Sequence, residues 1–173
     1  LLTGLNDGQG GYALGGVQLK AKLGEGGVGC VYLGWHSRLN VLVAVKVLKE
    51  ASTGKVPQFL REARLCARLD HANLVRVLDV NVDFGSGLNY IVMEYVPGCS
   101  AYQMLQTQLD KYGKPVSEIA ALEIALSSAR GLAAAHRMGI VHRDVKSDNI
   151  LVRARDGAVK VTDLGFAGNW KDS

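Results

Sequence analysis

Three polar side chains stand close together in one short stretch of the sequence, His142–Asn149. Asp144 is followed by Lys146 two positions later and by Asn149 five positions later. Phosphoryl transfer needs a carboxylate to accept the proton of an attacking hydroxyl, an ammonium to steady the transferred phosphate, and an amide oxygen for magnesium. The spacing therefore indicates phosphoryl transfer, and the alternative is an ordinary polar loop after a helix.

A second motif, Gly24–Val31, has the pattern G-x-G-x-x-G-x-V and lies between two segments with strand character. Glycines allow a tight backbone turn and bring N–H groups against phosphate oxygens without a Cβ in the way. A dinucleotide-binding fold uses similar glycines, but it continues into a helix and an acidic residue about twenty positions later. Here residues 30–35 are β-branched and aromatic, which predicts a strand and therefore a glycine-capped hairpin.

An apolar strand, 43–48, is interrupted by a single lysine, Lys46. Strand alternation places Lys46 on one face with Ala44 and the valines on the other. A buried ammonium is costly without an anion, and Glu62, in a helix expected over 57–69, is the candidate partner. The alternatives are that Lys46 protects an edge strand from aggregation and that Glu62 is a solvated helix charge.

The segment 159–167 predicts a strand that ends in Asp163-Leu164-Gly165. An acidic residue followed by glycine after a strand most often forms only a turn. Because this turn follows the Asp144 loop, Asp163 would supply a second oxygen ligand opposite Asn149 and complete a magnesium site.

Taken in order, these motifs resemble those of the eukaryotic-type protein kinase family. The resemblance begins near Tyr12 and includes the Gly-rich loop, the V-A-x-K strand, the helix glutamate, the H-R-D catalytic loop and a D-L-G in place of D-F-G. Lys146 resembles the serine/threonine branch, because tyrosine kinases usually lack a lysine there. The sequences of the glycine loop and of residues 136–142 are similar to those of bacterial serine/threonine kinases.

The resemblance implies that the parent protein transfers the γ-phosphate of ATP to serine or threonine hydroxyls of protein substrates, with ATP and Mg²⁺ as cofactors. Asp144 would be the catalytic base, and Lys146 would contact the γ-phosphate. Lys46, oriented by Glu62, would hold the α- and β-phosphates.

The same resemblance implies the residues around the nucleotide. Asn149 and Asp163 would bind magnesium, the glycines would cover the phosphates, and Leu151 would form the floor of the adenine site. The remaining expected contacts are the adenine ceiling, the gatekeeper at Met93, the hinge and the loop itself: Leu23, Gly24, Glu25, Gly26, Gly27, Val28, Gly29, Val31, Ala44, Lys46, Glu94 and Val96.

The sequence departs from the family pattern at three positions. Ser147 replaces the usual proline of the catalytic loop, Leu164 replaces the usual phenylalanine, and Cys66 stands where a larger apolar residue is common. None of the charged catalytic positions is altered. This favours an active kinase over the alternative, a pseudokinase or nucleotide-binding signalling scaffold. A small-molecule kinase is a more distant alternative, because Lys146 and the glycine loop fit it poorly.

The implied fold is α+β and bilobal: a small antiparallel β-sheet lobe with one helix, then a mainly helical lobe that is incomplete here. We expect a glycine-rich linker or N-terminal extension over 1–16, the ATP-binding lobe over 17–95 and part of the second lobe over 96–173. Strands are expected near 17–23, 30–36, 41–48, 74–80, 88–94, 150–154 and 158–162, and a short helix near 100–110.

A longer helix is predicted to begin after Ser117, which would cap it. Five apolar residues fall on one face of this helix at a period of 3.6. They are predicted to be core: Ile119, Leu122, Leu126, Ala129 and Ala133.

Composition limits the class of protein further. A hydrophobic content of 48% is sufficient for a core, but no apolar run approaches the roughly 18 residues of a spanning helix. Three scattered cysteines favour reduced thiols, and no secretory signal is recognisable. We expect a cytoplasmic domain. The net charge of +4 comes without a basic run interleaved with aromatics, which argues against nucleic-acid binding.

The length of the chain is short for this resemblance. A kinase domain of the family is considerably longer than 173 residues, and the sequence opens on Leu1 without an initiator methionine and ends before an A-P-E motif. We therefore expect a fragment, inactive alone, of a longer protein with sensory or transmembrane domains beyond Ser173.

Overall fold

The structure, a computed structural model, describes residues 12–27, 29–48, 63–83 and 85–164. Two units divide the chain: one contains Leu1–Ala67 and Arg76–Tyr95, and the other contains Arg68–Val75 and Val96–Ser173. The boundary after Tyr95 coincides with the expected hinge. The segment before Arg76 joins the second unit although it precedes two strands of the first.

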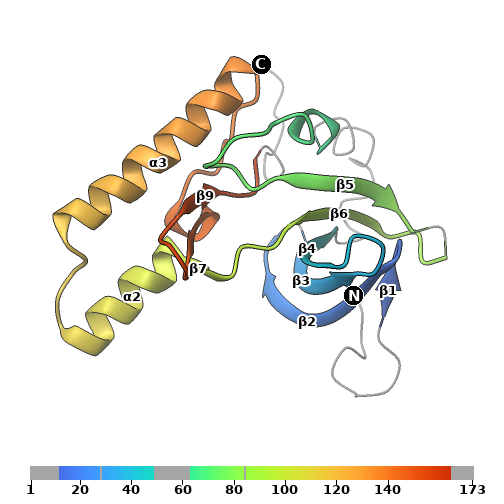
Figure 1. Cartoon of the computed structure of the whole chain (residues 1–173), viewed down its shortest axis with the longest axis horizontal. Helices are drawn as coiled ribbons and strands as arrows, with labels where there is room; N and C mark the ends of the chain where they lie inside the picture. The colour runs from blue at the N-terminus through green and yellow to red at the C-terminus, as the bar shows by residue number, and fades with distance from the viewer. Residues whose placement is uncertain (1–11, 28, 49–62, 84, 165–173) are drawn as a thin grey trace. The chain divides into compact units, whose positions relative to one another are not determined.

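The first unit is a six-stranded sheet with the order β1-β2-β3-β4-β6-β5, in which every neighbouring pair is antiparallel. Figure 1 shows the strands curling tightly. The strands are β1 (Ala13–Leu14), β2 (Val17–Glu25), β3 (Gly29–His36), β4 (Val41–Leu48), β5 (Val77–Val82) and β6 (Asn89–Glu94).

Alternation along β4 explains the core of this sheet. Val43, Val45 and Val47 are fully buried and pack into one cluster, to which the other strands contribute Leu14, Val17, Leu19, Cys30, Tyr32, Tyr90 and Val92. Burial of each such side chain contributes about 1.5–3 kcal/mol. On the opposite face of β4, Ala44, Lys46 and Leu48 are also buried.

Two expected boundaries in the first unit differ from the structure. The linker expected over 1–16 contains β1. Leu14 of this strand pairs with Val17 of β2, and its side chain, only 1% exposed, packs into the core cluster. The strand expected near 74–80 begins at Val77, since the preceding residues belong to the other unit. Of the helix expected over 57–69, only 63–69 is described, and residues 63–66 are helical.

The second unit combines a three-stranded sheet, order β7-β8-β9, with two helices. Its elements are β7 (Gly98–Ser100), α2 (Ala101–Tyr112), α3 (Glu118–Arg137), the 3₁₀ turn η2 (Ser147–Asn149), β8 (Ile150–Arg153) and β9 (Val159–Val161). Both helices begin at a serine. Ser100 forms a reciprocal capping box with Gln103, and Ser117 Oγ accepts from the Ala120 N–H, as predicted.

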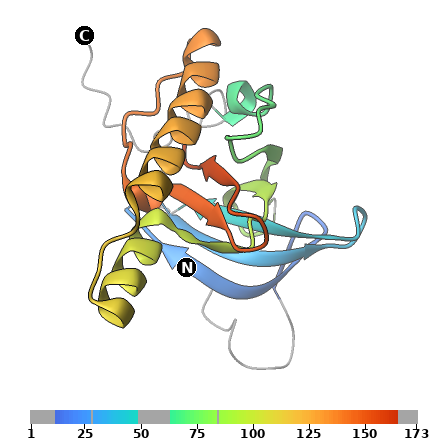
Figure 2. The ribbon, with the colours of Figure 1, turned by 60° about the vertical axis from the view of Figure 1, so that its left-hand side comes forward.

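The prediction that the apolar stripe of α3 is core is wrong for the part of the chain that the structure describes. Ile119, Leu122 and Leu126 are 71%, 68% and 53% exposed. The helix instead buries a face of small residues, Ser128, Gly131, Ala134 and Ala135. Small side chains let α3 approach β9 closely, and Figure 2 shows the helix running beside the β8–β9 hairpin. Among the described helices, none is long and apolar enough to cross a membrane.

Candidate active site

The catalytic loop of the second unit gathers the three polar side chains that the sequence singled out. Lys146 Nζ lies 2.7 Å from Asp144 Oδ2. The Asn149 amide donates to the backbone oxygen of Asp144 at 2.8 Å and to its Oδ2 at 3.1 Å. The turn η2 brings Asn149 back to the start of the loop, and its N–H donates to the Lys146 carbonyl at 3.0 Å. One carboxylate oxygen therefore receives both a cation and an amide.

This arrangement fixes the charge state of Asp144. The hydrogen bond from Lys146, reinforced by the one from Asn149, holds the pKa of the Asp144 carboxyl below its usual value. The same contact raises the pKa of the Lys146 ammonium. Both groups are charged at neutral pH, since opposite charges favour each other's ionised form.

A buried histidine ties this loop to the end of β9. His142, only 1% exposed, has Nε2 at 2.8 Å from the Thr162 carbonyl oxygen and Nδ1 at 3.3 Å from the Asp144 N–H. A carbonyl accepts and an N–H donates, so the neutral tautomer with the proton on Nε2 satisfies both contacts. Sequence reasoning did not find this link, because Thr162 takes part only through its backbone.

The two expected magnesium ligands are brought together by the backbone. The Thr162 N–H, directly before Asp163, donates to the Asn149 carbonyl at 2.9 Å. Both hydrogen bonds of the Asn149 side chain use its nitrogen, so its Oδ1 receives no donor from the described residues. An uncommitted amide oxygen near a carboxylate suits Mg²⁺, which prefers oxygen ligands. The residues present therefore fit the ion.

The Gly-rich loop of the first unit is the turn between β2 and β3. A Cβ at Gly29 would overlap the Val47 carbonyl, so glycine is needed there for packing. No atom lies within 4 Å of a Cβ added at Gly24, Gly26 or Gly27. Packing among the described residues therefore does not explain those three glycines, and their contact with phosphates stays a prediction.

Strand register places the other expected nucleotide contacts of the first unit on one face. Val31 pairs with Lys46, and Ala44 pairs with Met93. Directly paired residues of an antiparallel sheet share a face, as do residues two apart along β4. Lys46 is 5% exposed in a central strand, which rules out the alternative that it protects a sheet edge.

The remaining expected site residues are distributed as follows. Leu23 is exposed, and Glu25 pairs with Lys22 at 2.5 Å. The Glu94 carboxylate accepts a hydrogen bond from the Arg76 backbone N–H at 2.8 Å. Val96 is buried, and Leu151 lies half-buried in β8 of the second unit. Glu62 and Val28 fall outside the described residues, so the Lys46–Glu62 ion pair stays a prediction.

Comparison with known proteins agrees with this geometry. Residues 17–173 match the family described as "Protein kinase domain". The chain belongs to the protein kinase family, because this match covers nearly all of its length. The chain takes the family's fold, and the fold class expected from the sequence is confirmed.

The more specific likeness is to bacterial serine/threonine kinases. A probable serine/threonine-protein kinase of Clostridium perfringens, CPE1738, is 42% identical over 154 residues, which cover 87% of this chain and 21% of that protein. PksC of Streptomyces coelicolor is 39% identical over 168 residues, covering 91% and 30%. PknB of Mycobacterium leprae is 40% identical over 157 residues, covering 87% and 24%. The bacterial-type resemblance is thereby confirmed.

Solved structures give the same answer. The crystal structure of the Mycobacterium tuberculosis PknI kinase domain superposes with a TM-score of 0.79 at 30% identity, covering 91% of this chain and 63% of that one. The chain therefore spans less than two thirds of a solved kinase domain. It spans between 21% and 30% of the three curated relatives.

Proposed function

We propose that these residues are the nucleotide-binding and catalytic-loop part of a serine/threonine protein kinase, which transfers the γ-phosphate of ATP to hydroxyls of protein substrates. The observation that carries the proposal is the Asp144–Lys146–Asn149 set, in which one ionised carboxylate is oriented by an ammonium and an amide. The names of the relatives support the choice of serine and threonine.

In the proposed reaction Asp144 Oδ2 accepts the proton of the substrate hydroxyl while the hydroxyl oxygen bonds to the γ-phosphorus of ATP. The bond from that phosphorus to the β,γ-bridging oxygen breaks, and ADP leaves. Lys146, already held 2.7 Å from that oxygen, neutralises charge on the transferred phosphoryl group. Asn149 keeps the carboxylate in one orientation through its amide nitrogen. Little covalent chemistry is asked of the protein, because phosphoryl transfer is catalysed mainly by positioning and electrostatics.

ATP would lie against the shared face of Val31, Ala44 and Lys46, with its phosphates under the bare backbone of the Gly-rich loop. Asn149 Oδ1 and the Asp163 carboxylate would hold Mg²⁺. When bound, the ion neutralises the phosphate oxygens. Lys46 would bind the α- and β-phosphates, and its burial limits its choice of partner to an anion. We place the activity in the cytoplasm, where ATP and protein substrates are available.

The proposal is tested on the complete gene product that contains residues 1–173. Asp144→Asn keeps the size of the side chain and removes the carboxylate, so we expect phosphorylation of a generic protein substrate to fall by about 100-fold or more. ATP affinity should be retained. Asp148→Asn, an exposed carboxylate of the same loop, is the matched control and should keep most of its activity.

Three results would contradict the proposal. Equal activity of Asp144→Asn and the parent would remove Asp144 from the chemistry. Predominant phosphotyrosine in the product would contradict the serine/threonine assignment. Tight Mg-ATP binding with no phosphorylation by the parent protein would favour the pseudokinase alternative.

A further inference from the structure

The residues just before β5 pair with β9 in the sheet of the second unit. Leu74 forms a parallel bridge with Val161 of β9. The Val161 N–H donates to the Asn73 carbonyl at 2.9 Å, and the Val75 N–H donates to the Val161 carbonyl at 2.8 Å. Residues 73–75, here called the β9 strap, therefore fill the edge of β9 that β8 leaves open.

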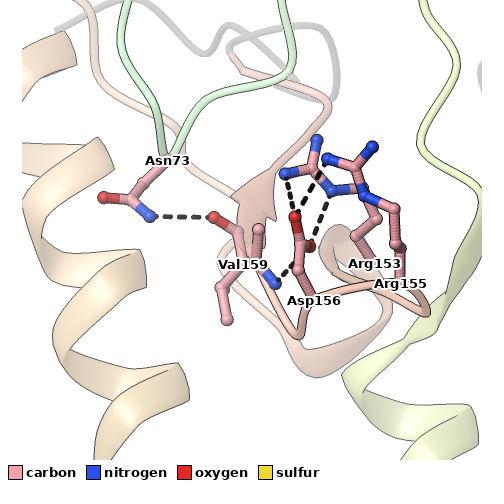
Figure 3. Close-up of polar contacts among 6 residues, drawn as sticks. Asn73, Arg153, Arg155, Asp156 and Val159 are labelled. Atoms are coloured by element: carbon pink, nitrogen blue, oxygen red, sulfur yellow. Dashed lines mark hydrogen bonds and ion pairs between the residues drawn. The ribbon is translucent and has the colours of Figure 1, made fainter.

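Side chains reinforce the β9 strap from both directions. The Asn73 amide nitrogen donates to the Val159 carbonyl at 2.9 Å, a contact that Figure 3 shows. From β9, Lys160 Nζ donates to the Leu74 carbonyl at 3.2 Å. The Asn73 N–H is itself directed by His71 Nδ1, which accepts it at 3.1 Å. All three residues of β9 thus contact the strap.

Helix α3 closes the strap from behind. A Cβ on Gly131 would lie 2.5 Å from the Asn73 carbonyl oxygen and 3.0 Å from Leu74 Cδ2. The helix backbone therefore rests directly on the strap, and no side chain larger than hydrogen fits between them. This contact leaves the Asn73 carbonyl little freedom to move away from Val161.

The other edge of β9 is equally constrained. Figure 3 shows Asp156 at the β8–β9 turn, where its carboxylate accepts from Arg153 Nε at 2.8 Å and Nη2 at 2.7 Å. It also accepts from the Ala158 N–H at 3.2 Å. The Arg153 guanidinium holds the pKa of Asp156 far below its usual value, so Asp156 is ionised at neutral pH and keeps its ion pair with Arg153.

Asp163, two residues beyond Val161, needs this support. Its φ of 62° is in the left-handed region, which is unfavourable for a residue with a Cβ and persists only where the surroundings determine it. The residues immediately before it supply that determination: Val161 through the strap, and Thr162 through His142 and Asn149.

We propose that Asn73 is a positioning residue for Asp163: through the β9 strap it fixes the strand that presents this carboxylate to the nucleotide-bound magnesium. This inference rests on the proposed function. Asn73 touches neither substrate nor cofactor and acts only through Val159 and Val161. Its substitution should therefore change the magnesium-dependent part of ATP binding and leave the magnesium-independent part unchanged.

The test compares ATP affinity with excess Mg²⁺ and with a chelator, by calorimetry on the complete protein. Asn73→Asp replaces the amide donor with an oxygen that faces the Val159 carbonyl. We expect the gain in affinity from Mg²⁺ to shrink about fivefold, the effect of one lost hydrogen bond. Asn81→Asp is the matched control, because Asn81 is an exposed β5 residue whose amide reaches only Asp79 among the described residues.

Hydrogen exchange gives a second readout that does not depend on ligand. In the nucleotide-free protein, Asn73→Asp should speed exchange at the amides of 159–163, while Asn81→Asp should not. Lys160→Met removes a different bond between the same two segments and should shift both readouts in the same direction. It also serves if Asn73→Asp fails to fold.

The outcomes separate the two hypotheses. A parent protein whose ATP affinity does not respond to Mg²⁺ overturns the proposed function itself. A parent that responds normally, together with Asn73→Asp and Lys160→Met variants that keep the full response, overturns the positioning role alone. Loss of thermal stability without a change in the Mg²⁺ response would likewise make Asn73 purely structural.

Discussion

The six-stranded sheet of the first unit and the catalytic loop of the second unit hold their functional side chains in place in different ways. In the sheet, Lys46 and Ala44 share a face because β4 alternates and is paired on both sides. In the loop, Asp144 is placed by individual hydrogen bonds: its carboxylate accepts from Lys146 and Asn149, and its backbone N–H donates to His142 Nδ1. A repetitive backbone tolerates the loss of one bond better than a set of single contacts does.

Because single contacts hold the catalytic loop, we expect the largest loss of activity from a substitution at His142. His142→Phe fills a similar space but leaves the Thr162 carbonyl and the Asp144 N–H without their partner. Displacement of a catalytic group by about 1 Å can cost about 100-fold in rate, and we expect kcat to fall by that order. Kinetics on the complete protein measure it, with His136→Phe on the exposed end of α3 as control. Unchanged kcat would show that the loop holds Asp144 without the imidazole.

A smaller effect, on stability, is expected where the sheet itself is tightly packed. Gly29→Ala would push a methyl group into the Val47 carbonyl, which cannot move without breaking the β3–β4 ladder. Overpacking of this kind costs about 1–3 kcal/mol. Thermal unfolding should show the loss. A variant as stable as the parent would mean that β3 shifts freely at its first residue.

The smallest effect is expected two residues earlier, at Gly27. A Cβ there meets no described atom, so Gly27→Ala should change the unfolding free energy by less than about 0.5 kcal/mol. If phosphates approach this backbone, ATP affinity should still fall, by about fivefold. Parallel ATP titrations of Gly27→Ala and the parent provide the measurement. Equal affinities would place the nucleotide away from Gly27.

Much of the sheet could be predicted from sequence, because its signals are local. The alternation in 41–48 predicted both the bounds of β4 and the face that carries Lys46, and the glycine pattern predicted the hairpin. The motifs also predicted which charged residues meet in the catalytic loop. Ser117 was identified as a helix cap for the same reason, since capping depends on residues three positions apart.

The predictions failed where burial depends on distant partners. The period of Ile119, Leu122 and Leu126 was read correctly as a helix face, but period alone does not say which face is covered. The buried face instead carries small residues such as Gly131 and Ala135, and at Gly131 only a hydrogen fits against the 73–75 backbone. Asn73 carries no local signal either, since its partners Val159 and Val161 contribute only backbone atoms.

The short strand β1 has a practical consequence for anyone who defines the limits of this domain. The family match begins at residue 17, yet Leu14 of β1 is buried in the core cluster, and a Cβ on Gly15 would overlap the Tyr90 hydroxyl. A recombinant protein that started at residue 17 would lack β1 and the side chain that Leu14 contributes to the core cluster. Removing Leu14 alone would forfeit about 2 kcal/mol of burial. The structural limit of the first unit therefore lies upstream of its evolutionary one.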